Sequence, residues 1–215
     1  MSMPPPQPDF DRVARIYRWA EYLALGPLLQ RTRTHFLPQL TGCRRALMLG
    51  DGDGRFLARL LQQEATLHAA AVDTSARMLD LLRARCVFAD DRLHTRNASA
   101  LTVDVQPDTD LIVTHFFLDC LTQPEVDALT QRIGAGTQPG TLWLLSDFAL
   151  PRSSALRPFA ALYIRTLYVA FRILTGLRVT HLPDPQTALA ASNFIRVARH
   201  ERLGGLIYTE IWKHQ

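Results

Sequence analysis

Short apolar runs alternate with helical patterns from residue 45 to the end of the chain. The apolar runs predict strands over residues 45–49, 67–72, 92–96, 110–114, 141–146, 195–203 and 206–212. Helices are predicted between them over 54–64, 75–85 and 124–133, with Ser75 as an N-cap. Strands that alternate with helices form a mostly parallel sheet covered on both faces. Gly204 and Gly205 separate the last two strands and predict an antiparallel hairpin.

Three segments lie outside this alternation. Residues 1–9 are rich in proline and predict a disordered tail, and residues 10–40 show apolar positions at helical spacing, which predicts a helical cap. Residues 151–193 form a helical insertion within the main domain, which we place at 41–215. The insertion helix either packs on the core, covers the carboxyl ends of the strands as the lid of an apolar pocket, or touches a membrane surface. Its three nearby arginines do not make the dense basic face typical of the last interpretation.

Three glycines spaced two apart, Gly50, Gly52 and Gly54, follow the first predicted strand. Such a turn lets the backbone approach a ligand closely, and the helix after it presents free N–H groups to that ligand. Asp73 ends the second apolar run, where its carboxylate can accept both hydroxyl protons of a ribose. The separation of Gly50 and Asp73 is close to the ~20 residues of a nucleoside-binding βαβ unit. The pattern therefore predicts a nucleoside site.

The G-x-G-x-G row resembles motif I of the class I S-adenosylmethionine-dependent methyltransferases. Residues 73–79 resemble the acidic loop of that family, residues 97–99 its adenine-binding segment, and residues 110–115 its motif IV. Residues 10–17 resemble the N-terminal cap of small-molecule enzymes related to the quinone-biosynthesis C-methyltransferases. The resemblance implies a Rossmann-like three-layer α/β sandwich, with a seven-stranded, mostly parallel sheet and an antiparallel C-terminal hairpin.

The resemblance also implies S-adenosylmethionine as the cofactor. Its site would be formed by Gly50, Asp51, Gly52, Gly54, Asp73, Thr74, Met78, Asn97, Ala98, His115 and Tyr17. Met48 and Asn97 depart from the pattern, because the family has an acid at each position. An amide can still accept a hydrogen bond from an exocyclic amine. The missing acid at Met48 either weakens cofactor binding, or Asp51 or Asp53 takes over its role at the cofactor's amino end. The alternative role of both acids is that of turn and helix N-terminal residues.

Candidate catalytic residues follow the fourth and fifth predicted strands. Methylation of a hydroxyl or carbon benefits from a base that removes the acceptor proton. His115 is the first candidate because an unperturbed histidine titrates near neutrality, and Asp119 and Asp147 are the others. Each has a structural alternative. His115 could hydrogen-bond a backbone group at the strand end, Asp119 could cap the helix near Thr122, and Asp147 could be a turn acid.

Composition excludes several function classes. The net charge of +4 and the pI near 9.3 raise nucleic acid as a partner, but basic and acidic residues alternate and no like-charge run reaches five, so none is expected. No uncharged apolar run reaches 18 residues, so integral membrane association is not expected. Cys43, Cys86 and Cys120 lie far apart without a CxxC pair, which predicts no metal site, no disulfide framework and a reduced, cytoplasmic setting.

Taken together, these features predict a methyltransferase that acts on a small, apolar or aromatic acceptor at oxygen or carbon. Three alternatives stay open: an RNA methyltransferase, a degenerate cofactor-binding module that serves as a regulator or partner subunit, and an NAD-dependent oxidoreductase. The oligomeric state is also open, a homodimer included. The acceptor itself is not predicted.

Overall fold

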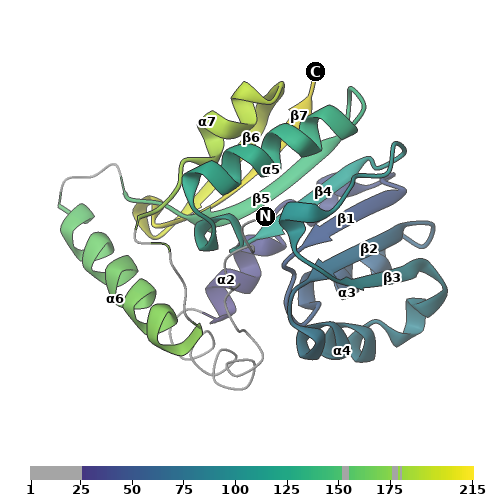
Figure 1. Ribbon diagram of the computed structural model, residues 1–215, viewed down its shortest axis with the longest axis horizontal. Coiled ribbons are helices and arrows are strands. Elements are labelled where there is room, and N and C mark those ends of the chain that lie inside the picture. Colours follow the sequence, from purple (N-terminus) through teal and green to yellow (C-terminus); the bar gives the residue numbers. More distant parts are fainter. Residues whose placement is uncertain (1–25, 152–154, 176–178, 180) are drawn as a thin grey trace, which may run out of the picture.

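The computed structural model describes residues 26–151, 155–175, 179 and 181–215 (Figure 1). Its strands are β1 (Arg45–Leu49), β2 (His68–Asp73), β3 (Leu93–Asn97), β4 (Leu111–His115), β5 (Leu142–Phe148), β6 (Phe194–Arg202) and β7 (Ile207–His214). Its α-helices are α2 (Gly26–Arg33), α3 (Arg55–Gln63), α4 (Ala76–Arg85), α5 (Gln123–Gly136), α6 (Arg157–Thr175) and α7 (Pro185–Ala191). Short 3-10 helices are η1 (Leu37–Leu40), η2 (Val87–Arg92), η3 (Ala100–Thr102), η4 (Leu118–Cys120) and η5 (Leu203–Gly205).

The strands form one sheet in the order β3-β2-β1-β4-β5-β7-β6. All neighbouring pairs are parallel except those made by β7, which runs antiparallel to both β5 and β6. This arrangement confirms the predicted fold, and the bounds of each predicted strand lie within two residues of the observed ones. The order reverses between β1 and β4, and ligands of open α/β sheets bind beyond the strand ends at such a reversal.

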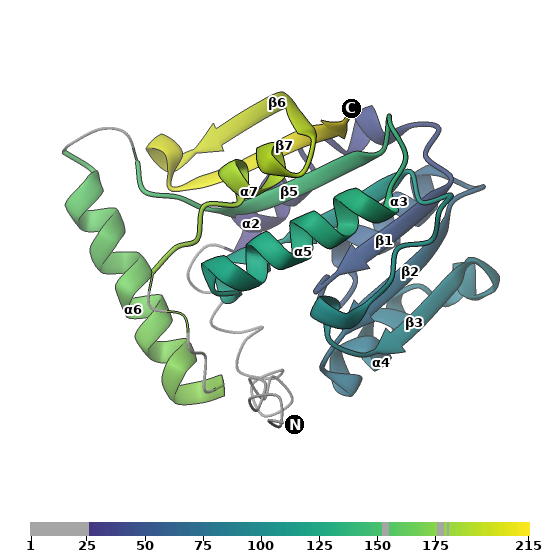
Figure 2. The same cartoon turned by 45° about the horizontal axis from the view of Figure 1, so that its top comes forward.

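Helices lie on both faces of the sheet (Figures 1 and 2). Their apolar side chains cover it. Successive residues of a strand point to opposite faces. Met48 of β1 therefore packs with α3 and α4, whereas its neighbours Leu47 and Leu49 pack with α5 and α7. Because both of its faces are covered, β1 is a continuous apolar run from residue 46 to residue 49.

Local chemistry sets where the helices begin. The Ser75 hydroxyl accepts a hydrogen bond from the Met78 N–H at 3.1 Å, which confirms Ser75 as the N-cap of α4. Thr122 and Glu125 form a capping box at the start of α5, so Asp119 is not needed as the cap of that helix. Asp119 instead lies in η4, three residues before Thr122.

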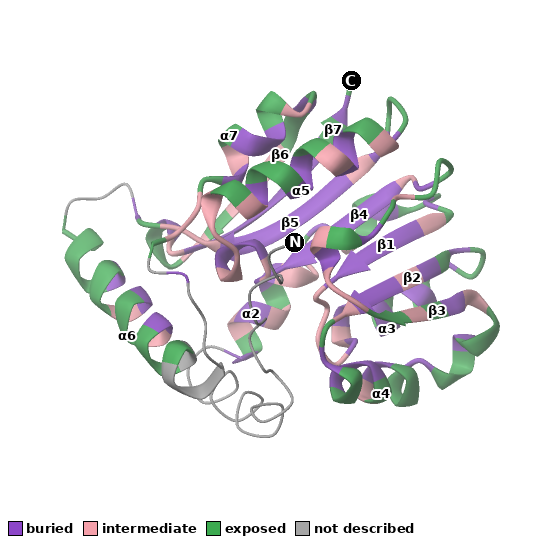
Figure 3. Ribbon diagram, viewed as in Figure 1, coloured by how far each residue is buried: buried purple, intermediate pink, exposed green. Residues whose placement is uncertain are grey.

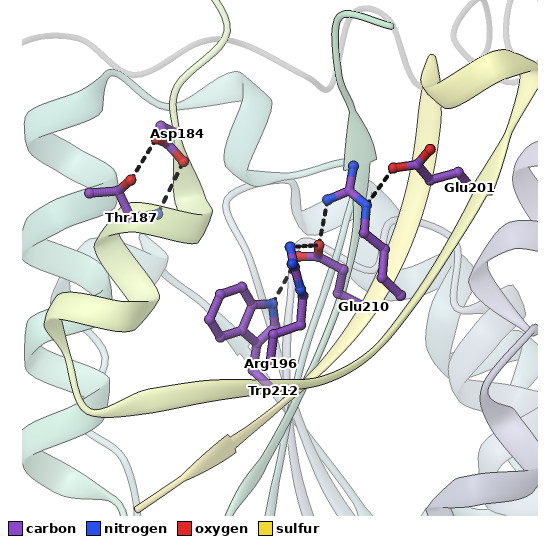
Figure 4. Close-up of polar contacts among 7 residues, drawn as sticks. Asp184, Thr187, Arg196, Glu201, Glu210 and Trp212 are labelled. Carbon is purple, nitrogen blue, oxygen red and sulfur yellow. Dashed lines mark hydrogen bonds and ion pairs between the residues drawn. The ribbon is translucent and has the colours of Figure 1, made fainter. Parts of the chain in front are cut away.

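The outer hairpin holds a fully buried carboxylate. Glu210 of β7 is 0% exposed and accepts hydrogen bonds from Arg196 at 3.1 Å, from Arg199, and from the Trp212 indole at 2.9 Å (Figure 4). Arg199 also pairs with Glu201 at 2.6 Å. Charged hydrogen bonds thus satisfy a group whose burial would otherwise be costly.

The insertion contains α6 and a helix that the sequence analysis did not predict, α7. Asp184 caps α7, because its carboxylate accepts hydrogen bonds from the Thr187 N–H at 3.0 Å and the Thr187 hydroxyl at 2.6 Å (Figure 4). Pro185 takes the first helical position, where a missing N–H costs nothing. In Figures 1 and 2, α6 stands at the edge of the molecule, beyond the carboxyl end of β5.

Candidate functional site

The turn between β1 and α3 is built from three glycines in the left-handed region. The φ angles of Gly50, Gly52 and Gly54 are 67°, 61° and 75°. A Cβ on Gly54 would lie 2.7 Å from the Leu82 Cγ, and one on Gly50 would lie 2.4 Å from the Phe117 ring. A Cβ on Gly52 would meet nothing within 4 Å. Packing therefore requires the outer two glycines, whereas the middle one leaves bare backbone for a ligand to approach.

The two acids of this turn have different surroundings. Asp53 pairs with Arg55 and with Arg85 of α4, both at 2.9 Å, so its carboxylate ties the turn to α4. Asp51 is half-buried and accepts a hydrogen bond from the Leu57 N–H at 3.3 Å. Burial raises the pKa of Asp51 to about 7, and the charge of Arg33 opposes that rise. Of the two acids that the sequence offered in place of Met48, Asp51 is the one without an ion pair within the described residues.

Asp73 is fixed at the carboxyl end of β2, next to the glycine turn. The Gly50 N–H donates to the Val72 carbonyl at 3.0 Å, which joins the turn to the strand that carries Asp73. The Asp73 Oδ1 accepts from the Ser75 N–H at 2.8 Å, and its backbone carbonyl accepts from the Asn97 side chain at 3.0 Å. These contacts hold the carboxylate at the strand tip.

The remaining residues of the predicted cofactor site surround this tip. Asn97 is the register partner of Asp73 on β3, and the Ala98 N–H donates to the Asp73 carbonyl at 3.1 Å. Thr74 is exposed, whereas Met78 is 8% exposed on α4. The loops after β1, β2 and β3 therefore bring together all predicted cofactor residues of the described chain except His115. Tyr17 and residues 10–25 of the predicted cap lie outside the described residues.

His115 is the last residue of β4 and is 3% exposed. Its Nδ1 lies 2.9 Å from the Ser146 hydroxyl, which in turn donates to the Thr209 hydroxyl at 2.9 Å. Its Nε2 is buried and has no hydrogen-bond partner within the described residues. Burial lowers the pKa of His115 well below its ordinary value, and Arg33 lowers it further. The ring is therefore neutral at pH 7, and its partner is a side chain, not a backbone group.

Asp119 and Asp147 meet on the other face of the sheet. Asp147 follows Ser146, the register partner of His115, so it points away from His115. Its Oδ2 accepts a hydrogen bond from the Asp119 N–H at 3.1 Å, and the carboxyl groups of the two residues act on each other's pKa. Burial raises the pKa of Asp119 to about 6, and burial together with the charge of Asp119 raises that of Asp147 well above its ordinary value.

This carboxyl pair lies beneath α6. Tyr168 of α6 donates its hydroxyl to the Asp119 carbonyl at 3.1 Å. Ile164 and Tyr168 are buried against Cys120, which adjoins Asp119, and against Phe148 at the end of β5. The inner side of α6 thus covers the ends of β4 and β5 with apolar and aromatic side chains, which agrees with both the core-packing and the lid interpretations.

Arg33 is a site residue that sequence reasoning missed. It comes from α2, and its guanidinium lies 5.0 Å from the centre of the Phe116 ring, directly after β4. Its charge acts on both Asp51 and His115. No sequence signal marks it, because only the packing of α2 brings it to the strand ends. Among the residues that the structure describes, no three acids, histidines or cysteines are grouped so as to hold a metal ion.

Comparison with known proteins finds a matching domain model and solved structures of similar fold. A model of the methyltransferase domain matches residues 46–140, and a search of curated proteins gives no match. The solved mitomycin 7-O-methyltransferase MmcR is 15% identical, with a TM-score of 0.66 over 96% of this chain and 61% of that chain. An O-methyltransferase family 2 protein from Planctomyces limnophilus, solved in complex with apigenin, is 19% identical, with a TM-score of 0.70 over 94% of this chain and 62% of that one.

A third structure, the N-methyltransferase NodS from Bradyrhizobium japonicum, is 14% identical, with a TM-score of 0.60 over 86% of this chain and 96% of that one. The chain therefore spans about three-fifths of the length of the first two structures, and the likeness to all three is one of fold. The matched segment contains the glycine turn, Asp73, His115 and Asp119. Residues 46–140 are thus similar to a methyltransferase domain, and the chain as a whole has the fold of the solved methyltransferases.

Proposed function

We propose that this chain transfers the methyl group of S-adenosylmethionine to a small, apolar or aromatic acceptor, at oxygen or carbon. The observation that carries the proposal is the buried Asp119–Asp147 pair, which lies under the apolar inner side of α6 at the strand ends. Two solved structures of similar fold are titled O-methyltransferases, which supports a small-molecule acceptor.

The residues present fit the cofactor. The open backbone at Gly52 gives room for close approach, and the fixed carboxylate of Asp73 suits a ribose diol. Asn97 and Ala98 would line the adenine with Thr74 and Met78, and Asp51 would face the amino-acid end. When bound, the cofactor supplies an electrophilic methyl group on a sulfonium sulfur.

The carboxyl pair supplies a base for the acceptor. Burial and the charge of Asp119 raise the pKa of Asp147 well above its ordinary value, so Asp147 would keep its proton while Asp119, with a pKa of about 6, ionises. Asp119 would accept the proton that the acceptor's oxygen or carbon loses when it is methylated. A base with a pKa of about 6 is suited to this task because it is ionised at pH 7 and still binds a proton readily.

His115 is the second candidate base, on the strength of its buried Nε2. It lies on the opposite face of the sheet from Asp147, beside Phe56 at a ring distance of 4.5 Å. Its neutral imidazole would serve an acceptor that enters from the α3 side. The two bases therefore correspond to two different acceptor positions, and variants separate them.

The experiment is a product assay with matched variants. Wild-type protein is incubated with S-adenosylmethionine and a panel of phenols and apolar carbon acids, and formation of the demethylated cofactor is measured. We expect turnover of at least one acceptor, which Asp119→Asn reduces and the exposed control Asp90→Asn does not. Turnover that is lost in His115→Gln but kept in Asp119→Asn would identify His115, on the other face of the sheet, as the base. An absence of turnover with every acceptor would favour the regulatory module.

A further inference from the structure

The segment that carries α6 has no acidic residue. Residues 148–183 contain no Asp or Glu and five arginines: Arg152, Arg157, Arg165, Arg172 and Arg178. The three on α6 are exposed, and within the described residues none has an ion-pair partner. The described part of this segment therefore carries positive charge that no described acid pairs with, although its arginines are fewer than those of a dense basic face.

The outer side of α6 is also apolar. Phe159 is 73% exposed, Leu162 is 65% exposed and Val169 is 51% exposed, although Ala160, Ile164 and Tyr168 already bury the inner side. Figure 3 shows the helix largely exposed, with its buried positions on the side that faces the rest of the chain. A helix that only packed on the core would have one apolar side, and this one has two.

Helical geometry gathers these features on one surface. Phe159, Leu162 and Val169 are three and seven residues apart, so they share one side of the helix. Arg165 and Arg172 are seven residues apart and flank that side. Exposed apolar residues bordered by arginines on a helix are typical of segments that lie in the interfacial plane of a membrane.

We propose that the outer side of α6 docks the protein onto an anionic lipid surface. The charge selects the occupant: a second copy would bring its own unpaired arginines to the contact, whereas phosphate headgroups neutralise them. The helix would lie along the surface, since none in the described part of the chain has the length and hydropathy to traverse a bilayer. The proposal stands whether or not the chain transfers a methyl group.

Vesicle co-sedimentation of the full chain tests this docking. The probes are vesicles of phosphatidylcholine alone, and vesicles of phosphatidylcholine and phosphatidylglycerol in equal parts. We expect binding to the anionic vesicles only, weakened by added salt because exposed charges are screened. Phe159→Ser with Leu162→Ser should weaken the partition at least about tenfold, and Arg165→Gln with Arg172→Gln should weaken it by a similar factor.

Matched control variants remove exposed apolar side chains or exposed arginines from parts of the surface away from α6. Val87→Ser with Phe88→Ser removes exposed apolar side chains from η2, and Arg59→Gln with Arg96→Gln removes two exposed arginines. Both control pairs should bind as wild type does, which supports the proposal. Failure of the wild type to bind, equal loss in controls and test variants, or a dimer in sedimentation that the Phe159→Ser and Leu162→Ser pair dissolves would each overturn it.

Discussion

The backbone N–H of Asp119 donates to the Asp147 carboxylate at 3.1 Å, and the Phe148 N–H donates to the other oxygen of the same carboxylate at 2.9 Å. The loop after β4 is thereby joined to the end of β5. Both carboxyl groups are buried, at 8% and 2% exposure, and this burial raises the pKa of each above that of a solvated aspartate. In such a pair the ionised carboxylate can act as the base, and the neighbouring carboxylic acid can donate a hydrogen bond to it.

Variants of this pair should differ in their kinetics. Asp119→Asn should lower kcat about 100-fold or more, because the base is lost. Asp147→Asn should retain most activity, because an amide N–H replaces the carboxylic acid proton. For wild type, kcat/KM should rise with pH through about 6 as Asp119 ionises. The check is a pH–rate profile for all three proteins, and equal losses in both variants would contradict the assignment of the base.

The same pair should make stability depend on pH. A carboxyl with a raised folded-state pKa stabilises the fold fully below its unfolded value, near 3.8, and this contribution is lost as pH rises through about 6. Between about pH 4 and 7, wild type should therefore lose about 1–3 kcal/mol more of its unfolding free energy than Asp119→Asn does. Urea titrations across this range measure the difference, and parallel curves would show that burial does not perturb Asp119.

The sequence predicted the central strands because β1 and β4 are buried on both faces. Leu47, Met48 and Leu49 form a continuous apolar run for that reason, and Ser75 carries its capping role in its own side chain. Asp184, Pro185 and Thr187 form a helix N-cap pattern of the same kind at the start of α7, although that helix was not predicted.

Pairings that depend on register could not be predicted. Asp119 and Asp147 are 28 residues apart and meet only because β4 and β5 align with His115 opposite Ser146. Arg33 reaches the strand ends through the packing of α2, which no local pattern specifies. The roles assigned to the residues around Asp73 stay predictions.

The glycine turn should separate stability from binding. Gly54→Ala should cost about 2–4 kcal/mol of unfolding free energy, because it adds left-handed strain to a clash with Leu82. Gly52→Ala should cost only about 1–2 kcal/mol, since its Cβ meets open space. Gly52→Ala should instead weaken the binding of the cofactor, because its Cβ occupies the space that the ligand approaches. Chemical denaturation and calorimetry of both variants measure the contrast, which equal stability losses would refute.

The buried carboxylate of the hairpin offers a test of the fold alone. Glu210→Gln should destabilise by about 1–3 kcal/mol, because it weakens charged hydrogen bonds to Arg196 and Arg199 at a site with no solvent. Glu201→Gln is the matched control, and it should cost under about 1 kcal/mol because its side chain is 37% exposed. Thermal unfolding distinguishes them, and cofactor affinity should stay unchanged in both.

Calorimetric titration with S-adenosylmethionine is the most direct measurement of the central claim. Wild type should bind the cofactor, and Asp73→Ala should lose about 1–3 kcal/mol of binding free energy, because ribose hydroxyls lose a charged acceptor. Asp80→Ala removes an exposed carboxylate from α4 and should bind as wild type does. Unchanged affinity in Asp73→Ala, or no binding to wild type, would contradict the account.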